Sequence, residues 1–212
     1  MFRVLVPAAL SLSLAGCGMA GHSLTSGFAN SGQPAPRSRT QETGSVDQPT
    51  KRVVAKVEDR APKGAYEKAP KGALTDRDYS ATRLDVEKAR DLVNAYRKSK
   101  GLRPLLLQPA LTEAARAHSR DLAKWDRISH FGSDGSNPWD RVKRAGYSAK
   151  LAAENVGTGQ VNIEEVMKGW QASPGHNKNL LLAEAQHMGI ALVQDSKTEF
   201  KTFWTLVIGS PL

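Results

Sequence analysis

A change in sequence character near residue 80 limits what this chain can fold into. Residues 18–79 are rich in Gly, Pro, Ser, Thr and charged residues and show no sustained apolar period. Such a segment cannot bury enough apolar surface to offset the conformational entropy that folding removes. From Ser80 onward, apolar residues recur at regular spacings. We therefore expect residues 80–212 to form the folded domain and residues 17–79 to be a disordered tether.

Four segments after residue 80 show the spacing of amphipathic helices. Each begins at a capping residue or a proline, and the first and third end near a glycine. The expected helices run from the Thr82–Asp85 cap to Gly101, from Pro109 to Trp125, from Pro138 to Ala145 and from Asn162 to Trp170.

Two later segments predict strands. Residues 187–193 and 200–208 carry β-branched and aromatic residues on either side of Asp195-Ser196-Lys197, so they are typical of a hairpin. Helices followed by strands favour an α+β fold. The glycines at 132 and 135 and the Ser-Pro-Gly segment at 173–175 are interpreted as turns.

The first residues resemble an export signal. Arg3 supplies a positive charge, and Val4–Leu14 is an apolar run shorter than the roughly 20 residues of a membrane span. Leu14-Ala15-Gly16-Cys17 resembles the lipobox of bacterial lipoproteins. The resemblance implies a signal peptide at residues 1–16, diacylglycerol on the Cys17 thiol and acylation of the new amino terminus. Two acyl chains give stable membrane anchoring.

An ordinary secretory peptide with an incidental cysteine is the alternative, and both interpretations predict export. Gly18 follows the cysteine; in lipoproteins, a residue other than Asp here implies the outer membrane, or the outer face of the cell membrane in a cell that lacks one. Cys17 is the only cysteine, so no intramolecular disulfide can form.

The net charge of +9 is compatible with nucleic acid, anionic lipid or an acidic envelope polymer as a partner, but its distribution argues against nucleic acid. Residues 80–212 hold nineteen Lys or Arg against fourteen Asp or Glu, scattered through mixed-sign segments such as 85–100. We expect no nucleic acid partner. Electrostatic attraction of the basic tether to acidic envelope polymers is a weaker hypothesis.

Several short motifs lie in register along residues 84–210. They are "LVNAYRKSKGLRPLLLQPALTEAARAHSRDLAKW", "ISHFGSDGSNPWDRVKRAGY", "AENVGTG", "GWQASPGHNKNLL" and "HMGIAL". Their order and spacing resemble the bacterial branch of the CAP superfamily, which also contains cysteine-rich secretory proteins and plant pathogenesis-related proteins. The resemblance implies an α-β-α sandwich in which helices flank a small antiparallel sheet.

The resemblance also implies a cavity site at His130, Glu154 and His176. Imidazole and carboxylate ligands suit a divalent metal such as zinc. Sequence spacing alone does not assemble this group, because no compact metal motif is present. The second carboxylate of animal and plant members is missing, since Ala172 and Ser173 stand there.

Other interpretations of these residues stay open. His130 and His176 are equally explained as hydrogen-bonded loop residues, and Glu154 as an acceptor of backbone donors. His118 lies on the apolar stripe of the second expected helix, so we interpret it as a packing histidine that lines the same interior. No nucleophile elbow accompanies the serines near the histidines.

Three functional hypotheses follow from the sequence. The first is a lipid-anchored envelope protein whose CAP domain binds a lipid, an envelope polymer or a protein without turnover. The second is a metal-dependent hydrolase acting on an envelope polymer, with Glu154 as ligand or base. The third is a structural envelope protein in which the cavity residues only stabilise the fold.

Overall fold

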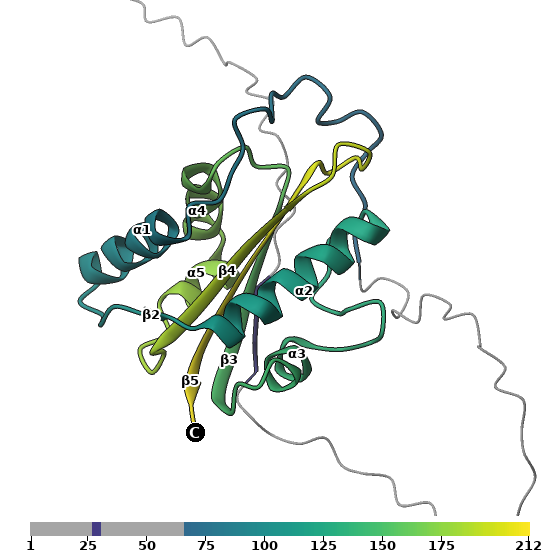
Figure 1. Ribbon diagram of the computed structural model, residues 1–212. Helices are drawn as coiled ribbons and strands as arrows, with labels where there is room; N and C mark the ends of the chain where they lie inside the picture. Colours follow the sequence, from purple (N-terminus) through teal and green to yellow (C-terminus); the bar gives the residue numbers. More distant parts are fainter. Residues whose placement is uncertain (1–26, 31–65) are drawn as a thin grey trace, which may run out of the picture.

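The computed structural model describes residues 27–30 and 66–212 (Figure 1). The expected signal peptide and Cys17 lie outside the described residues, and so does most of the expected tether. The helices are α1 (Val86–Ser99), α2 (Pro109–Trp125), α3 (Pro138–Arg144), α4 (Ile163–Ala172) and α5 (Pro174–Leu180). The strands are β1 (Gly27–Asn30), β2 (Leu106–Leu107), β3 (Ala149–Thr158), β4 (His187–Gln194) and β5 (Thr202–Pro211).

The strands form one sheet with the order β1-β3-β5-β4-β2. The three long strands pair antiparallel, with Glu154 opposite Val207 and Ile190 opposite Leu206. The expected hairpin of β4 and β5 and the antiparallel core of the sheet are therefore present. The sheet differs from the expectation at one edge, because the two-residue β2 pairs parallel with β4.

Helices cover both faces of the sheet, which confirms the α-β-α sandwich. Figure 1 shows α1, α4 and α5 on one side of the strands and α2 and α3 on the other. Side chains of β5 alternate between these two layers. Trp204, Leu206 and Ile208 pack with the α1 and α4 residues, whereas Phe203 and Val207 pack toward α2 and α3.

The four expected helices are present, but the cap of α1 is Asp85 itself and not a Thr82–Asp85 pair. Asp85 accepts a hydrogen bond from Lys88 N, and proline occupies the first turn of α2. At α4, Asn162 Oδ1 accepts from Glu165 N. The Glu165 carboxylate accepts from Val161 N, which stands one residue before the cap, so the expected capping box closes one residue early.

The segment at 173–175 is a helix start, although its sequence favours a turn. Pro174 is the first residue of α5, where its missing N–H costs nothing, and Ser173 is the cap position. Strand β3 has no counterpart among the elements expected from periodicity. Its last seven residues are all buried, so the strand lacks the polar and apolar alternation that marks a half-exposed strand.

Residues 66–79 pack against the domain, although the sequence assigns them to the tether. Leu74 contacts the cluster of Ile128, Val156 and Phe203. Tyr79 donates its hydroxyl hydrogen bond to Gly159 O at 2.9 Å, and Arg77 pairs with Glu165. The strand β1 also lies in the expected tether and pairs with β3. The fold therefore includes residues before the expected boundary at residue 80.

The helices within the described residues all fall short of what crossing a membrane requires in length and apolar character.

Candidate functional site

The centre of the site is the carboxylate of Glu154, in the middle of β3. The residue is completely buried. Its Oε2 accepts a hydrogen bond from Arg141 Nη2 at 2.7 Å, and its Oε1 accepts one from His130 Nδ1 at 2.9 Å. His118 Nε2 lies 3.5 Å from the same Oε1. Glu154 is thus surrounded by one guanidinium group and two imidazoles.

Arg141 fixes this cluster from α3. Its Nη1 donates to Ser136 O at 2.8 Å, and its Nη2 also donates to His130 O at 3.0 Å. The guanidinium therefore links α3 both to the preceding loop and to Glu154. Burial alone would raise the pKa of Glu154, but the charge of Arg141 and then the two histidines hold it below its usual value. The carboxylate is ionised at neutral pH.

His118 reaches the cluster from α2. Its Nε2 lies 2.8 Å from Ser129 O, and because a carbonyl oxygen only accepts, Nε2 carries the hydrogen. Nδ1 is then a bare acceptor. Burial lowers the pKa of His118 to about 4, even though the Glu154 charge opposes this effect. The ring is neutral at physiological pH.

The structure brings His130 and Glu154 together but places His176 in another layer. Successive residues of a strand point to opposite faces, so Asn155 faces away from the Glu154 side chain. The Asn155 amide donates to His176 O at 3.1 Å, and Asn179 Nδ2 donates to Asn155 Oδ1. His176 therefore belongs to the buried network between β3 and α5.

The donor set does not fit a divalent metal in this arrangement. Within residues 27–30 and 66–212, no three His, Cys, Asp or Glu side chains are placed to hold one ion together. A cation at Glu154 would also meet the Arg141 guanidinium, which already neutralises the carboxylate. Zinc binding at His130, Glu154 and His176 stays a prediction, and no chemical step is derived from it.

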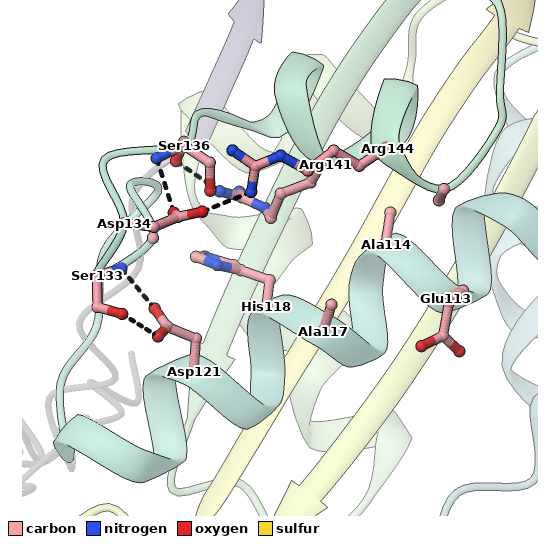
Figure 2. Close-up of a pocket in the computed structure, with 12 residues that line it drawn as sticks. Glu113, Ala114, Ala117, His118, Asp121, Ser133, Asp134, Ser136, Arg141 and Arg144 are labelled. Atoms are coloured by element: carbon pink, nitrogen blue, oxygen red, sulfur yellow. Dashed lines mark hydrogen bonds and ion pairs between the residues drawn. The ribbon is translucent and has the colours of Figure 1, made fainter. Parts of the chain in front are cut away.

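A cavity of about 390 Å³ lies above the cluster, between α2 and α3. Figure 2 shows His118 extending from α2 and the two arginine side chains extending from α3 toward the loop at 132–136. The lining residues are Glu113, Ala114, Ala117, His118, Asp121, Gly132, Ser133, Asp134, Ser136, Arg141, Arg144 and Ala145.

The loop over the cavity is held by local hydrogen bonds. Gly132 N donates to Ser136 O at 2.8 Å, and Ser136 N donates to the Asp134 side chain at 2.9 Å. A Cβ at position 132 would lie 2.6 Å from both the Asp134 carboxylate and the Ser136 hydroxyl, so a larger residue there would displace these two side chains. The turns expected at Gly132 and Gly135 are present. Their role is to shape one wall of the cavity.

Two acidic side chains of the cavity are already paired. Asp121 accepts hydrogen bonds from both the Ser133 hydroxyl, at 2.5 Å, and Ser133 N, at 2.8 Å. Asp134 pairs with Arg144 at the cavity rim. Ser133 therefore donates its proton to a carboxylate and not to a histidine.

Sequence reasoning missed Arg141, which organises the site. One signal was present: Pro138, Arg141 and Val142 are the buried residues of α3, so a charged residue stands on the apolar face of a short helix. Such a residue requires a buried partner. The sequence could not identify that partner as Glu154, because β3 was itself not expected.

Comparison with known proteins finds a matching family model and several similar proteins. Residues 90–208 match the model of the Cysteine-rich secretory protein family, CAP. The uncharacterized protein YkwD of Bacillus subtilis (strain 168) is 36% identical over 119 residues, which are 56% of this chain and 44% of YkwD. The uncharacterized membrane protein YlbC of the same strain is 28% identical over 121 residues, which are 57% of this chain and 35% of YlbC. The match spans less than half the length of these relatives.

Solved structures show the same fold. An extracellular SCP-domain protein from Bacillus anthracis aligns with a TM-score of 0.52 at 22% identity, covering 68% of this chain and 44% of the other. An outer surface protein from Borrelia burgdorferi aligns with a TM-score of 0.55 at 18% identity, covering 62% of this chain and 99% of the other. Because the family match covers more than half of the 212 residues, the chain belongs to the CAP, or cysteine-rich secretory protein, family.

Proposed function

We propose that this chain is an exported, lipid-anchored protein whose CAP domain binds a small ligand in the cavity between α2 and α3, without chemical turnover. The proposed export and anchoring rest on Arg3, the apolar run Val4–Leu14 and the lipobox that ends at Cys17. The description of the family as secretory agrees with export.

The observation that carries the binding role is the engagement of Glu154 beneath the cavity. A general base or a metal ligand must expose a lone pair to its target. Glu154 does not do so, because its side chain is completely buried and its oxygens are held by Arg141 and His130. The carboxylate stabilises the cavity floor, while the cavity itself lies within the usual size range of small-ligand sites, about 300–1,000 Å³.

The test is a small-molecule screen by protein-observed NMR. The informative variant is Ala117→Leu, because Ala117 lies on the exposed side of α2 and lines the cavity, so leucine fills space without disturbing the core. Ala95→Leu makes the same change on the exposed face of α1, away from the cavity, and is the matched control. Both substitutions keep a strong helix former.

We expect at least one compound to bind the unsubstituted chain and Ala95→Leu but not Ala117→Leu. Binding that survives Ala117→Leu would move the ligand site elsewhere, and a screen without any cavity ligand would contradict the proposal. Release of a product from a bound compound would contradict the absence of turnover.

A further inference from the structure

We infer that one end of the domain docks onto an anionic lipid surface. This end consists of residues 98–106, which follow α1 and include β2, and residues 178–186, which join α5 to β4; we call it the basic tip. The inference goes beyond the proposed cavity ligand, because it concerns another face of the domain and requires nothing to bind between α2 and α3.

The two segments of the basic tip lie side by side. Leu106 N donates a hydrogen bond to Gln186 O at 2.9 Å. Arg97 Nη1 donates to Leu180 O at 2.7 Å and to Leu182 O at 3.0 Å. Figure 1 shows both segments next to β2, at the end of the sheet opposite the turn between β4 and β5. They therefore form one continuous surface.

Buried polar side chains of α1 hold this surface in place. Besides its bonds to the second segment, Arg97 donates from Nε to Arg103 O at 2.9 Å. The Asn94 amide donates to Leu105 O at 3.0 Å, and its oxygen accepts from Leu105 N at 2.7 Å. A surface that is already ordered loses little conformational entropy when it docks.

The basic tip carries four exposed cationic side chains, which are Lys98, Lys100, Arg103 and Lys178. Across the described part of the chain, no acidic side chain forms an ion pair with any of them. Nearer the start of α1 the pattern differs, since Lys88 and Arg90 both pair with glutamates. Glu184 is the one acidic residue within the tip segments. This excess of positive charge attracts an anionic surface.

An exposed leucine lies among these cations. Leu106 is 63% exposed, and among the large apolar side chains of the described residues only Leu212 is more exposed. Pro104 is exposed beside it, and Leu102 is half-buried. Apolar side chains next to Lys and Arg suit a membrane interface, where the leucine enters the lipid and the cations contact the headgroups. A soluble acidic polymer offers Leu106 no apolar partner, so the leucine favours lipid as the occupant.

The proposed anchor at Cys17 agrees with this docking, although the inference does not require it. A tethered domain stays close to the membrane, so even weak surface binding is effective. The surface itself is testable in a chain that has no lipid.

The first experiment measures cosedimentation of the full chain carrying Cys17→Ser with lipid vesicles. One set of vesicles contains equal parts of phosphatidylglycerol and phosphatidylcholine, and the other contains phosphatidylcholine alone. The tip variant combines Lys98→Gln, Lys100→Gln and Arg103→Gln. Circular dichroism melting curves check that each variant is folded.

The matched control combines Lys124→Gln, Lys143→Gln and Lys150→Gln. These three lysines are exposed, lie outside the basic tip and form no ion pair with the described acidic side chains. Both variants lose the same charge and keep the same basic residues in the tether. Any difference between them therefore belongs to the tip.

We expect the parent chain to bind the anionic vesicles and not the neutral ones. The tip variant should bind the anionic vesicles about tenfold more weakly or less, whereas the control should stay close to the parent. Equal weakening of the two variants would overturn the inference, because net charge alone would then explain binding. A parent chain that does not bind anionic vesicles would overturn it as well.

A second measurement separates lipid from a soluble polyanion. Cys17 is the only cysteine, so the double variant Cys17→Ser, Leu106→Cys carries a single thiol that a bimane fluorophore can label. Cys17→Ser, Lys197→Cys places the same label in the turn at the opposite end of β4. We expect anionic vesicles to shift the emission to shorter wavelength at position 106 and to leave position 197 unchanged.

Emission that stays unchanged at position 106 while the tip variant loses binding would show that the tip binds anions by charge alone, and lipid docking would be wrong. None of these results depends on a compound in the cavity or on lipid at Cys17. Failure of the inference is therefore distinguishable from failure of the proposed function.

Discussion

The interaction between Arg141 and Glu154 links three parts of the chain through two side chains. Arg141 comes from α3, Glu154 from β3, and the arginine also holds the loop carbonyls of Ser136 and His130. A buried ion pair adds little net stability when compared with a well-packed apolar pair, but an unpaired buried charge is strongly destabilising. The two partners therefore depend on each other.

Arg141→Leu is expected to lower the free energy of unfolding by about 3–5 kcal/mol, because it leaves the Glu154 charge buried without its cation. Urea unfolding followed by circular dichroism measures the change. Arg144→Leu on the same helix is the control: Arg144 and Asp134 are both exposed, so the loss should stay below about 1 kcal/mol. Equal losses in the two variants would show that the buried Arg141–Glu154 pair contributes no more to stability than the exposed Arg144–Asp134 pair.

The neutral His118 makes stability depend on pH. Its pKa is about 4 in the folded chain against 6.5 for an unperturbed histidine, with Glu154, His130 and Arg141 facing the ring. As pH falls from 6.5 to 4, the unfolded chain binds a proton that the folded chain does not bind. Folding therefore loses stability across this window, by roughly 3 kcal/mol for one such group.

His118→Gln removes this group, so we expect the variant to lose much less stability than the parent chain between pH 6.5 and 4. Thermal unfolding at several pH values measures the difference between the two chains. Parallel curves would mean that His118 is protonated in the folded chain. The lowered pKa of Glu154 acts in a different window, since stability from an ionised carboxylate is lost only as pH falls below the unfolded value near 4.5.

The family resemblance grouped His130, Glu154 and His176, and helix periodicity placed His118 in the same interior; the structure brings His130, Glu154 and His118 together. The sequence could not predict that His176 lies in another layer. Which helix packs on which face of β3 depends on tertiary packing. Asn155 and Glu154 are adjacent in sequence, yet they contact different helices.

At the scale of elements, the approach of α2 to β4 sets the position of His118. Gly189 in β4 lies directly under the start of α2, and a Cβ there would meet Thr112 N at 2.1 Å and the Leu111 carbonyl carbon at 2.2 Å. Helix and strand backbones thus touch without a side chain between them. Only glycine permits this contact.

Gly189→Ala is expected to destabilise the fold by more than about 3 kcal/mol, because the added methyl group meets backbone atoms that cannot move away. Gly169→Ala is the matched control, since Gly169 lies inside α4 and its added Cβ would meet nothing within 4 Å. This second change should stabilise the chain by roughly 0.5–1 kcal/mol through helix propensity. Chemical denaturation of both variants measures the contrast, and a tolerated Gly189→Ala would contradict the close packing.

Long amphipathic helices were predictable because their period and caps agree, as in α1 and α2. The elements that periodicity missed lack those signals. The β3 strand is buried on both faces, and α5 has seven residues and no side-chain hydrogen bond at its cap. For such elements, tertiary burial decides the structure and local sequence does not.

At the scale of the whole molecule, residues 66–79 belong to the folded unit. A chain that begins at residue 80 loses the Leu74 contacts, the Tyr79 hydrogen bond and the Arg77–Glu165 ion pair. We expect these losses to lower the free energy of unfolding by about 2 kcal/mol. The melting temperature should then be several degrees lower than that of a chain that begins at residue 66. Differential scanning calorimetry measures the two melting temperatures. Identical values would show that the stable domain begins at residue 80.

Anchoring is a property of the whole molecule as well. Cys17→Ser is expected to abolish incorporation of a labelled fatty acid into the chain expressed in a bacterium, because the proposed lipid is carried by the Cys17 thiol. Recovery of the protein from the membrane fraction should fall in parallel. Labelling that persists in Cys17→Ser would show that the lipobox resemblance is misleading.

The short pairing of β1 with β3 also determines how the molecule would respond to mechanical force. Under the proposed anchor, a pull on the domain travels along the backbone from Cys17 and reaches β1 before it reaches Tyr66. Four residue pairs join β1 to β3, whereas nine join β3 to β5. The edge strand is therefore expected to detach first, while the antiparallel core of the sheet stays folded.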